Sequence, residues 1–250
     1  MIQINHISKT FAGRSILKDV SFTFETGKTN MIIGESGSGK TVLIRCMVGL
    51  NDVDSGEVLF NGRNFYNLDF KGKKEIRKEI GMLFQGGALF DSKTVEENVV
   101  FPLSMFTDLS ESEKRDRANF CLKRVNLANA NNLFPAELSG GMKKRVAIAR
   151  AISVQPKYLF CDEPNSGLDP KTSIVIDSLI KEITEEYNIT TVVITHDMNS
   201  VVENGDNIMF IYKGEKWWEG NKEEILKTDN LEAQDFVYAT KFMKELRKKL

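Results

Sequence analysis

The alternation of apolar and polar residues divides the first part of the chain into predicted strands and one helix. Residues 2 to 30 alternate, with turn signals at Ala12-Gly13 and Thr26-Gly27, and this pattern predicts short antiparallel strands. Met31-Ile32-Ile33 forms a compact apolar strand that leads directly into a glycine-rich loop. The residues from Thr41 to Val48 then predict a helix. A strand, a glycine-rich loop and a helix therefore follow one another.

The second half of the chain changes between helical and strand patterns. Residues 108 to 152 have helical patterning, and Ser110 with Glu113 fits a capping box. The continuous apolar runs at 158–161 and 191–195 predict strands of the kind buried in parallel sheets. A helix predicted over 172–187 joins these two strands, which makes a βαβ unit. Further strand and turn patterns lie at 57–62 and 209–218.

Composition and charge limit the class of protein. The chain has 250 residues, of which 41% are hydrophobic and 28% charged, as in a soluble globular protein long enough to bury a core. Its net charge of -1 gives no basic field, so we expect no nucleic-acid partner. The first residues do not resemble a signal peptide, and no apolar run approaches the roughly 20 residues that span a bilayer. We expect a soluble chain whose membrane role depends on a partner.

The glycine-rich loop carries a phosphate-binding motif. It reads Gly34-Glu35-Ser36-Gly37-Ser38-Gly39-Lys40-Thr41 and matches the pattern G-x-x-x-x-G-K-[ST] at every fixed position. Glycines let backbone N–H groups converge on phosphate oxygens at a helix N-terminus, which already favours anions. Lys40 is expected to reach the β- and γ-phosphates, and the Thr41 hydroxyl to bind Mg²⁺. The alternative is a glycine-rich turn with a chance lysine, which the flanking strand and helix disfavour.

Polar residues follow three of the predicted strands. Asp162 and Glu163 end the strand 158–161, at the edge of the sheet where α/β proteins bind ligands. Asp162 is expected to hold Mg²⁺ through water, and Glu163 to orient and polarise the attacking water. His196 follows the strand 191–195 and can donate a hydrogen bond to the γ-phosphate; Gln85 follows a predicted strand at 80–84 and can bind Mg²⁺ through its amide oxygen. Read alone, the two acids could begin a loop, His196 could begin a helix, and Gln85 would be unremarkable.

Residues Leu138 to Met142 read Leu-Ser-Gly-Gly-Met and are predicted to form a short loop. If this loop lies far from the P-loop of its own chain, its glycines cannot serve that P-loop. We therefore expect them to close over a nucleotide that a second copy holds. This interpretation predicts a homodimer that ATP switches.

Together these residues resemble an ABC transporter ATPase. The P-loop, Gln85, the segment 138–142, Asp162-Glu163, Ser166-Gly167-Leu168-Asp169 and His196 have the order and approximate spacing of that family. The resemblance covers essentially the whole chain. It implies an α/β fold of the P-loop NTPase class, the ABC ATPase fold, with a mixed-sheet core, an antiparallel β subdomain and an α-helical subdomain. It implies a single domain over 1–250, with 1–85 and 155–225 as a RecA-like core carrying the antiparallel subdomain, 86–154 as the helical subdomain and 226–250 as a C-terminal helical extension.

The resemblance also implies roles for individual residues. Phe11 would stack on the adenine, Ser139 and Gly141 would contact the γ-phosphate on the opposite subunit, and Ser166–Asp169 would cross the dimer seam. Two positions depart from the family pattern: Met142 replaces the commoner glutamine, and Asn165 replaces the usual threonine or phenylalanine. The implied sets are Lys40, Gln85, Glu163 and His196 for catalysis; Thr41, Gln85 and Asp162 for Mg²⁺; and Phe11, Gly34, Ser36, Gly37, Ser38, Gly39, Lys40, Thr41, Ser139, Gly140, Gly141 and Asp169 for ATP.

The segment Leu83 to Leu103 suggests a subclass. Its Phe-Gln-x-Gly-Ala-Leu-Phe-Asp-Ser pattern resembles the MlaF-type ATPases of MCE-domain phospholipid transporters. That resemblance implies permease subunits and an MCE-domain lipid-binding subunit as partners. Its aromatic residues could equally be core, or could form a groove for a short cytoplasmic helix of the permease. The basic, amphipathic segment from Asp235 to Leu250 is a surface helix, or a strut that reaches a neighbouring protomer or an anionic lipid surface.

These observations predict an ATP- and Mg²⁺-dependent ATPase that drives phospholipid transport from the cytoplasmic face of the inner membrane. An importer ATPase for amino acids or another small solute is the alternative within the family. An ABC protein that acts on DNA or ribosomes is disfavoured, because such proteins usually carry two cassettes or long inserted arms. A regulatory module without turnover is disfavoured by the intact Glu163 and His196.

Overall fold

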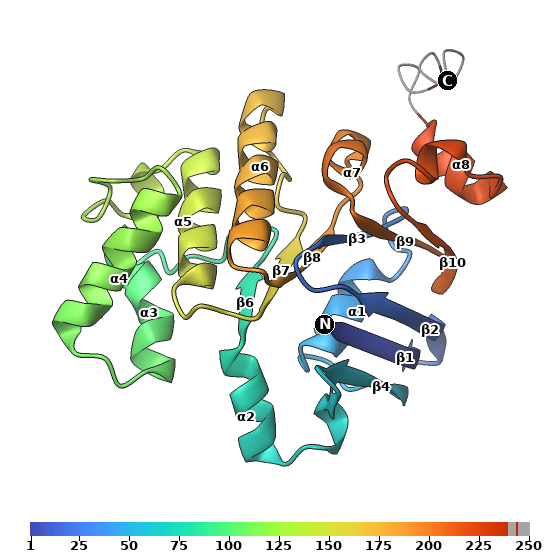
Figure 1. The fold of residues 1–250 in the computed structure, drawn as a ribbon, viewed down its shortest axis with the longest axis horizontal. Helices are drawn as coiled ribbons and strands as arrows, with labels where there is room; N and C mark the ends of the chain where they lie inside the picture. The colour runs from blue at the N-terminus through green and yellow to red at the C-terminus, as the bar shows by residue number, and fades with distance from the viewer. Residues whose placement is uncertain (240–243, 245–250) are drawn as a thin grey trace.

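The computed structural model describes residues 1–239 and residue 244, and it contains two sheets with helices around them (Figure 1). The larger sheet lies at the centre, and the helices α3, α4 and α5 form a group at one side of it. The strands are β1 Ile2–Phe11, β2 Arg14–Phe24, β3 Thr29–Ile33, β4 Ser55–Phe60, β5 Arg63–Asn64, β6 Ile80–Leu83, β7 Tyr158–Asp162, β8 Thr190–Ile194, β9 Asn207–Tyr212 and β10 Glu215–Gly220. The helices are α1 Lys40–Met47, α2 Phe70–Lys78, α3 Val95–Phe106, α4 Glu111–Arg124, α5 Gly140–Ile152, α6 Pro170–Glu186, α7 Met198–Asn204 and α8 Leu231–Val237.

The smaller sheet has the strand order β2-β1-β4-β5, and all its pairs are antiparallel. The larger sheet has the order β10-β9-β3-β8-β7-β6; its strands run parallel except for the β9–β10 hairpin. β3, which leads into the glycine-rich loop, pairs with β8 on one side and β9 on the other. The loop therefore leaves from the interior of the sheet, where the carboxyl ends of neighbouring strands surround it.

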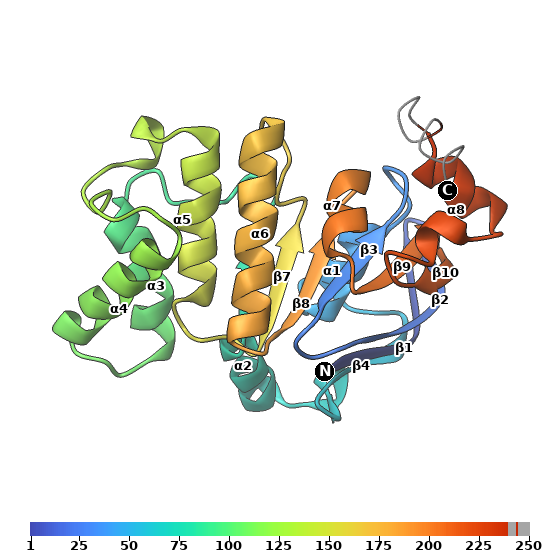
Figure 2. The same cartoon turned by 45° about the horizontal axis from the view of Figure 1, so that its top comes forward.

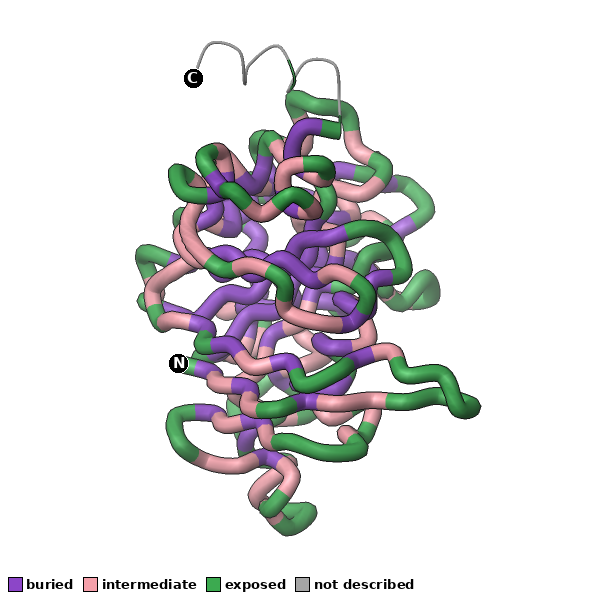
Figure 3. Tube along the Cα trace, turned by 90° about the vertical axis from the view of Figure 1, so that its right-hand side faces the viewer, coloured by how far each residue is buried: buried purple, intermediate pink, exposed green. Residues whose placement is uncertain are grey.

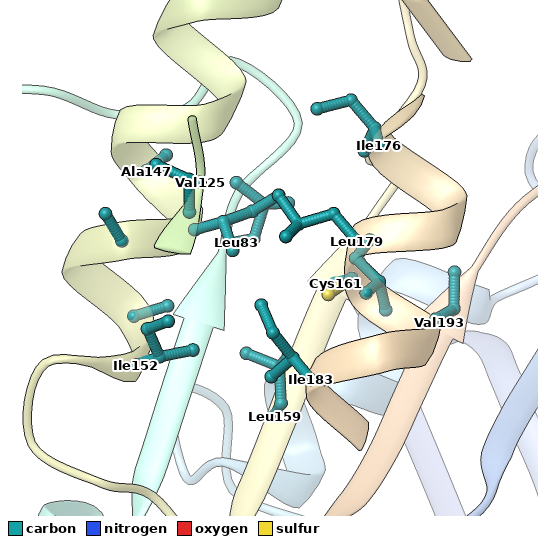
Figure 4. Close-up of a cluster of buried hydrophobic side chains, with 14 of the residues drawn as sticks. Leu83, Val125, Ala147, Ile152, Leu159, Cys161, Ile176, Leu179, Ile183 and Val193 are labelled. Carbon is teal, nitrogen blue, oxygen red and sulfur yellow. The ribbon is translucent and has the colours of Figure 1, made fainter. Parts of the chain in front are cut away.

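Alternation along the central strands divides the interior into two cores. In β7, Tyr158 and Phe160 face the core that α1 and the antiparallel sheet cover, whereas Leu159 and Cys161 face the opposite core. The second core packs against α5 and α6, which stand side by side in Figure 2. Figure 4 shows side chains from the strands and these helices meeting there, with Leu83, Leu159 and Cys161 among Ile152 of α5 and Ile176, Leu179 and Ile183 of α6. In Figure 3 the buried residues accordingly run through the middle of the molecule.

The structure confirms the predicted fold class, with its mixed sheet, antiparallel layer and helical layer. The predicted strands at 31–33, 158–161 and 191–195 are all present, with bounds that differ by at most two residues, and the Ser110–Glu113 capping box begins α4. The domain boundaries at 85–86 and 154–155 stay a prediction, although α3, α4 and α5 all lie between them. Of the predicted C-terminal helix 235–250, all but residues 235–239 and 244 lies outside the described residues.

One prediction is wrong. Residues 140–142 are not part of a loop: they form the first turn of α5, and the Ser139 side chain caps that helix by accepting a hydrogen bond from Met142 N at 3.2 Å. A Cβ added at Gly141 would lie only 2.6 Å from Cγ2 of Thr172 in α6. The glycine therefore permits the close approach of α5 and α6. From the sequence alone, a glycine needed for such a contact looks the same as a glycine needed for a turn.

Candidate active site

An open pocket of about 710 Å³ lies where the glycine-rich loop leaves β3. This volume is in the usual range for a small-molecule site. The pocket draws its walls from the glycine-rich loop, the start of α1, the ends of β6, β7 and β8, the β1–β2 hairpin and α8. The lining residues are Arg14, Ile16, Glu35, Ser36, Gly37, Gly39, Lys40, Thr41, Val42, Gln85, Glu163, His196 and Phe236.

Close packing explains two glycines of the loop. Gly34 has a φ of 145°, and a Cβ there would meet the carbonyl oxygen of Ile211 at 2.2 Å. Gly39 has a φ of 108° and is the residue from which α1 begins. A side chain at either position would be strained by its backbone conformation and by its neighbours. These glycines keep the loop pressed against β9 and β2, and the N–H groups at the start of α1 stay available to an anion.

The Lys40 side chain lies across this loop. Its Nζ donates hydrogen bonds to the carbonyl oxygens of Gly34 and Glu35, both at 2.8 Å, and the residue is buried. Burial lowers the pKa of Lys40, while the nearby carboxylates of Glu163 and Asp162 act in the opposite direction. The loop thus holds a buried cation at the position where phosphate oxygens of a bound nucleotide would need one.

Asp162 is a buried carboxylate with an unpaired oxygen. Its Oδ1 has no hydrogen-bond partner, and the residue is 8% exposed at the end of β7. Burial, and then the charge of Glu163, raises the pKa of Asp162; the Thr41 side chain lowers it by hydrogen bonding. An unpaired carboxylate oxygen beside a threonine hydroxyl fits a hard cation such as Mg²⁺, which prefers oxygen ligands and one or two carboxylates together with phosphate and water. Within residues 1–239 and 244, no group of three or more His, Cys, Asp and Glu side chains could hold a metal by itself.

Glu163 and His196 form a pair at the edge of the pocket. Nδ1 of His196 lies 2.7 Å from Oε2 of Glu163, and the Glu163 side chain is only 15% exposed. The backbone of Glu163 has a φ of 50°, in the left-handed region that residues other than glycine rarely adopt. Its N–H donates to the Ile194 carbonyl at 3.0 Å, so the strands β7 and β8 together fix this conformation. Strained residues of this kind cluster at functional sites.

Gln85 also lines the pocket. Its side-chain amide donates to Oγ of Ser166 at 3.4 Å, and its backbone carbonyl accepts a hydrogen bond from Lys144. The structure therefore brings together all four residues of the predicted catalytic set, and it brings Ser36, Gly37, Gly39 and Thr41 to the same pocket. Gly34 and Ser38 belong to the same loop behind this surface, and Ser38 lines a smaller adjoining hollow of about 210 Å³.

The residues predicted to act at the nucleotide site of the opposite subunit do not line this pocket. Ser139, Gly140 and Gly141 lie at the start of α5, which packs against β6. β8 and β7 separate β6 from the P-loop strand β3, and at roughly 4.8 Å between neighbouring strands this places β6 about 14 Å from β3. Asp169 is likewise outside the pocket; it caps α6 through hydrogen bonds from Lys171 N and Thr172 N, both at 3.1 Å.

Phe11 lies at the end of β1, also outside the residues that line the pocket. Its ring is 44% exposed, and the Lys9 ammonium lies 5.2 Å from the ring centroid. The same hairpin instead brings Arg14 and Ile16 to the pocket wall. Sequence reasoning missed these two residues, and it also missed Phe236 of α8 and the buried Lys144. For Phe236 and Lys144, the sequence indicated only that they lie on helical segments.

The family model described as "ABC transporter" matches residues 17–166, which is more than half of the chain. The chain belongs to the ABC transporter family. This ABC ATPase is 40% identical over 225 residues to the methionine import ATP-binding protein MetN of Clostridioides difficile, covering 90% of this chain and 70% of MetN. It is 34% identical over 236 residues to the probable ribonucleotide transport ATP-binding protein mkl of Mycobacterium bovis, covering 94% of this chain and 66% of mkl. The chain thus spans about two thirds of these relatives.

Solved structures of ABC cassettes have the same fold as this ABC ATPase. The dimeric bacterial ABC transporter cassette MJ0796 superposes with a TM-score of 0.82 at 35% identity, covering 89% of this chain and 99% of that one. CbiO1 of Clostridium perfringens, part of the ABC transporter complex cbiONQ, superposes with a TM-score of 0.84 at 29% identity, covering 100% of this chain and 98% of that one. Among the described residues of the ABC ATPase, no helix has both the length and the apolar character needed to cross a bilayer.

Proposed function

We propose that this ABC ATPase works as a head-to-tail homodimer that drives an importer for a small solute from the cytoplasmic face of the membrane. The observation that carries the proposal is the separation of two halves of one site. Lys40, Glu163 and His196 meet in a single pocket, whereas Ser139 begins a helix that packs against β6, which two strands separate from β3. A second copy, rotated about a two-fold axis, would supply the missing half to each pocket.

In this proposal each residue of the pocket has a role in hydrolysis. The P-loop N–H groups and Lys40 bind the phosphates, and Glu163 orients and polarises the attacking water. Nδ1 of His196 contacts the Glu163 carboxylate at 2.7 Å, and the one N–H of a neutral imidazole would be donated to the γ-phosphate instead once the nucleotide is bound. Phe11 stacks on the adenine after the exposed end of the β1–β2 hairpin folds over the base. Ser139, Gly140, Gly141 and Asp169 complete the opposite subunit's site.

Oxygen ligands for Mg²⁺ lie in this pocket and directly behind it. The Thr41 hydroxyl, the unpaired Oδ1 of Asp162 and the Gln85 amide oxygen would hold the ion beside the phosphates. When bound, the ion neutralises charge that develops on the transferred phosphoryl group. The buried carboxylate of Asp162 is stabilised in its charged form by such a cation, which offsets the desolvation that raises its pKa.

The surface around the segment 84–101 is the proposed contact with the permease. Phe84 and Phe90 are 38% and 40% exposed, and Phe90 packs against Phe101 with ring centroids 4.6 Å apart. The buried Asn98 fixes this loop, because its amide accepts from Phe90 N and donates to three carbonyls of the segment 90–94. A fixed loop with exposed aromatic rings suits an amphipathic helix of the membrane subunit. Closure of the dimer would move that helix.

The choice of a small solute as cargo rests on the curated relatives. MetN proteins with about 36–40% identity, from several bacteria, are methionine import ATP-binding proteins. The similarity to these three proteins covers 86–95% of this chain.

A phospholipid is the second candidate cargo, and one observation favours it. The segment Leu83–Leu103 resembles MlaF-type ATPases, and it contributes the exposed Phe84 and Phe90 to the proposed permease contact. In that case an MCE-domain subunit would be a partner. The nucleotide pocket suits both kinds of transporter equally well. The partner proteins, rather than this pocket, therefore identify the cargo.

Co-purification from native membranes tests the proposal. The ATPase would be isolated with its partners in mild detergent, and bound proteins and lipids identified by mass spectrometry. A Phe90→Ser variant should release the permease while leaving ATP binding intact, and a Phe120→Ser variant, which changes an exposed ring on α4, serves as the control. A solute-binding protein without an MCE-domain subunit supports the importer. An MCE-domain subunit with bound phospholipid supports the second candidate, and the absence of any membrane protein contradicts both.

A further inference from the structure

A buried lysine joins the start of α5 to the nucleotide pocket. Lys144 is 5% exposed, and its Nζ donates hydrogen bonds to the backbone carbonyl oxygens of Gln85 and, at 3.2 Å, Glu163. These two residues follow β6 and β7 and line the pocket. Lysine is almost never fully buried without partners, so its position here requires an explanation.

The lysine lies on the helix that Ser139 begins. Lys144 is four residues after Gly140, one turn further along the same face of α5. The first turn of α5 is held tightly on its other side, because Gly141 allows Thr172 of α6 to approach closely. A displacement of the Gln85 or Glu163 carbonyl would therefore pass through Lys144 to the helix end that carries Ser139.

A second buried cation on the same helix strengthens the connection. Arg150 donates to the carbonyl oxygens of Gly87 and Ala88, both at 2.7 Å, and is also buried. Lys144 and Arg150 together bind the loop that follows β6 over four residues, from Gln85 to Ala88. Lys144 alone adds the bond to Glu163, at the end of the neighbouring strand. It is the residue that connects both strand ends with α5.

We propose that Lys144 is a positioning residue that transmits the state of its own subunit's nucleotide pocket to the helix carrying Ser139. In the head-to-tail dimer, the Ser139 of one subunit serves the pocket of the other subunit. Lys144 therefore couples the two ATP sites. The coupling rests on the proposed dimer, but the transmission within one chain does not. The hydrogen bonds supply the physical link: ATP repositions Gln85 and Glu163, their carbonyls move Nζ, and α5 shifts as a rigid element.

The test measures amide hydrogen exchange of residues 139–146 with and without the ATP analogue AMP-PNP and Mg²⁺, on the full chain. In the wild type, nucleotide should slow exchange in this segment at least twofold. Lys144→Met should bind AMP-PNP with an affinity within twofold of wild type and lose that response. Lys143→Met, the same change at the neighbouring and partly exposed lysine, should keep it. Lys144→Gln, whose amide offers two donors, should restore part of the response and covers the case in which the methionine variant does not fold.

Steady-state ATPase measurements give the second readout. Lys144→Met should lower kcat about tenfold, with KM nearly unchanged, and should reduce the Hill coefficient toward 1. A nucleotide response that survives in Lys144→Met, or one that is absent in the wild type, overturns the proposal. If the wild type responds by exchange but hydrolyses ATP without cooperativity, the dimer of the proposed function is wrong and the role of Lys144 within one chain stands.

Discussion

Replacement of Asp177 by asparagine should stabilise the protein above pH 6, and this gain should be lost as the pH falls to 4. Asp177 projects from α6 into a cavity of about 870 Å³ beside the pocket, together with Asn165, Ser200, Asp197 and Glu203. Burial raises the pKa of Asp177 to about 6; weak hydrogen bonding from Asn165 and Ser200 opposes this effect, and the charges of Asp197 and Glu203 add to it. The buried side-chain atoms Nδ2 and Oδ1 of Asn165 and Oγ of Ser200 make no hydrogen bond within the usual distance and angle limits. They therefore compensate the negative charge of Asp177 only in part.

The sign follows from proton binding. Between the ordinary pKa of 3.8 and the folded-state value of about 6, the folded protein binds more protons than the unfolded chain, so stability falls as pH rises through this range. The difference between the two pKa values of Asp177 corresponds to at most about 3 kcal/mol of folding free energy, because a pKa difference of one is worth about 1.4 kcal/mol. Loss of the weak contacts with Asn165 and Ser200 should cost about 1 kcal/mol. Asp177→Asn should therefore be more stable than wild type by up to about 2 kcal/mol at pH 8.

Urea unfolding at several pH values between 4 and 8 measures this difference. The control is Glu185→Gln, which makes the same chemical change at an exposed position of the same helix, and it should give a difference near zero at every pH. A stability difference for Asp177→Asn that does not change with pH, or a variant less stable than wild type at pH 8, would refute the reasoning.

Two further variants test the divided site and the adenine contact. Ser139→Arg should leave ATP binding to the isolated subunit intact and abolish cooperative hydrolysis, because an arginine at the start of α5 blocks the opposite pocket; binding by calorimetry and turnover by phosphate release check this, and unchanged hydrolysis would argue against a shared site. Phe11→Ala should weaken ATP binding about 5- to 10-fold through lost stacking, whereas Phe11→Tyr should restore it; equal affinity in the alanine variant, measured by fluorescent-nucleotide titration, would remove Phe11 from the site.

Local sequence patterns predicted the elements that position the pocket. The run Met31–Ile33 and the glycines after it need only short-range rules, because a buried strand, a strained loop and a helix start each have a direct residue signature. The same is true of Asp162 and Glu163, which follow a continuously apolar strand. Their convergence with Gln85 and His196 was predicted because parallel strands end at one edge of a sheet.

The features that sequence did not reveal depend on contacts between distant segments. Gly141 looked like a turn glycine, and only its distance to Thr172 identifies it as a helix contact. Lys144 sits between other basic residues, and nothing local distinguishes the buried lysine from its partly exposed neighbour Lys143. Phe236 reaches the pocket from a helix near the end of the described chain, a long-range packing result that no local pattern encodes.

The central claim is that the pocket hydrolyses ATP with Glu163 orienting the water, and turnover of Glu163→Gln tests it most directly. The variant and wild type would be compared for ATP affinity and for phosphate release with saturating ATP and Mg²⁺, with Glu35→Gln, the same change at another acid of the pocket, as the control. Glu163→Gln should bind ATP as tightly as wild type while its kcat falls about 10²- to 10⁴-fold, and Glu35→Gln should stay within a few-fold of wild type. Turnover at the wild-type rate in Glu163→Gln would show that Glu163 does not orient the attacking water.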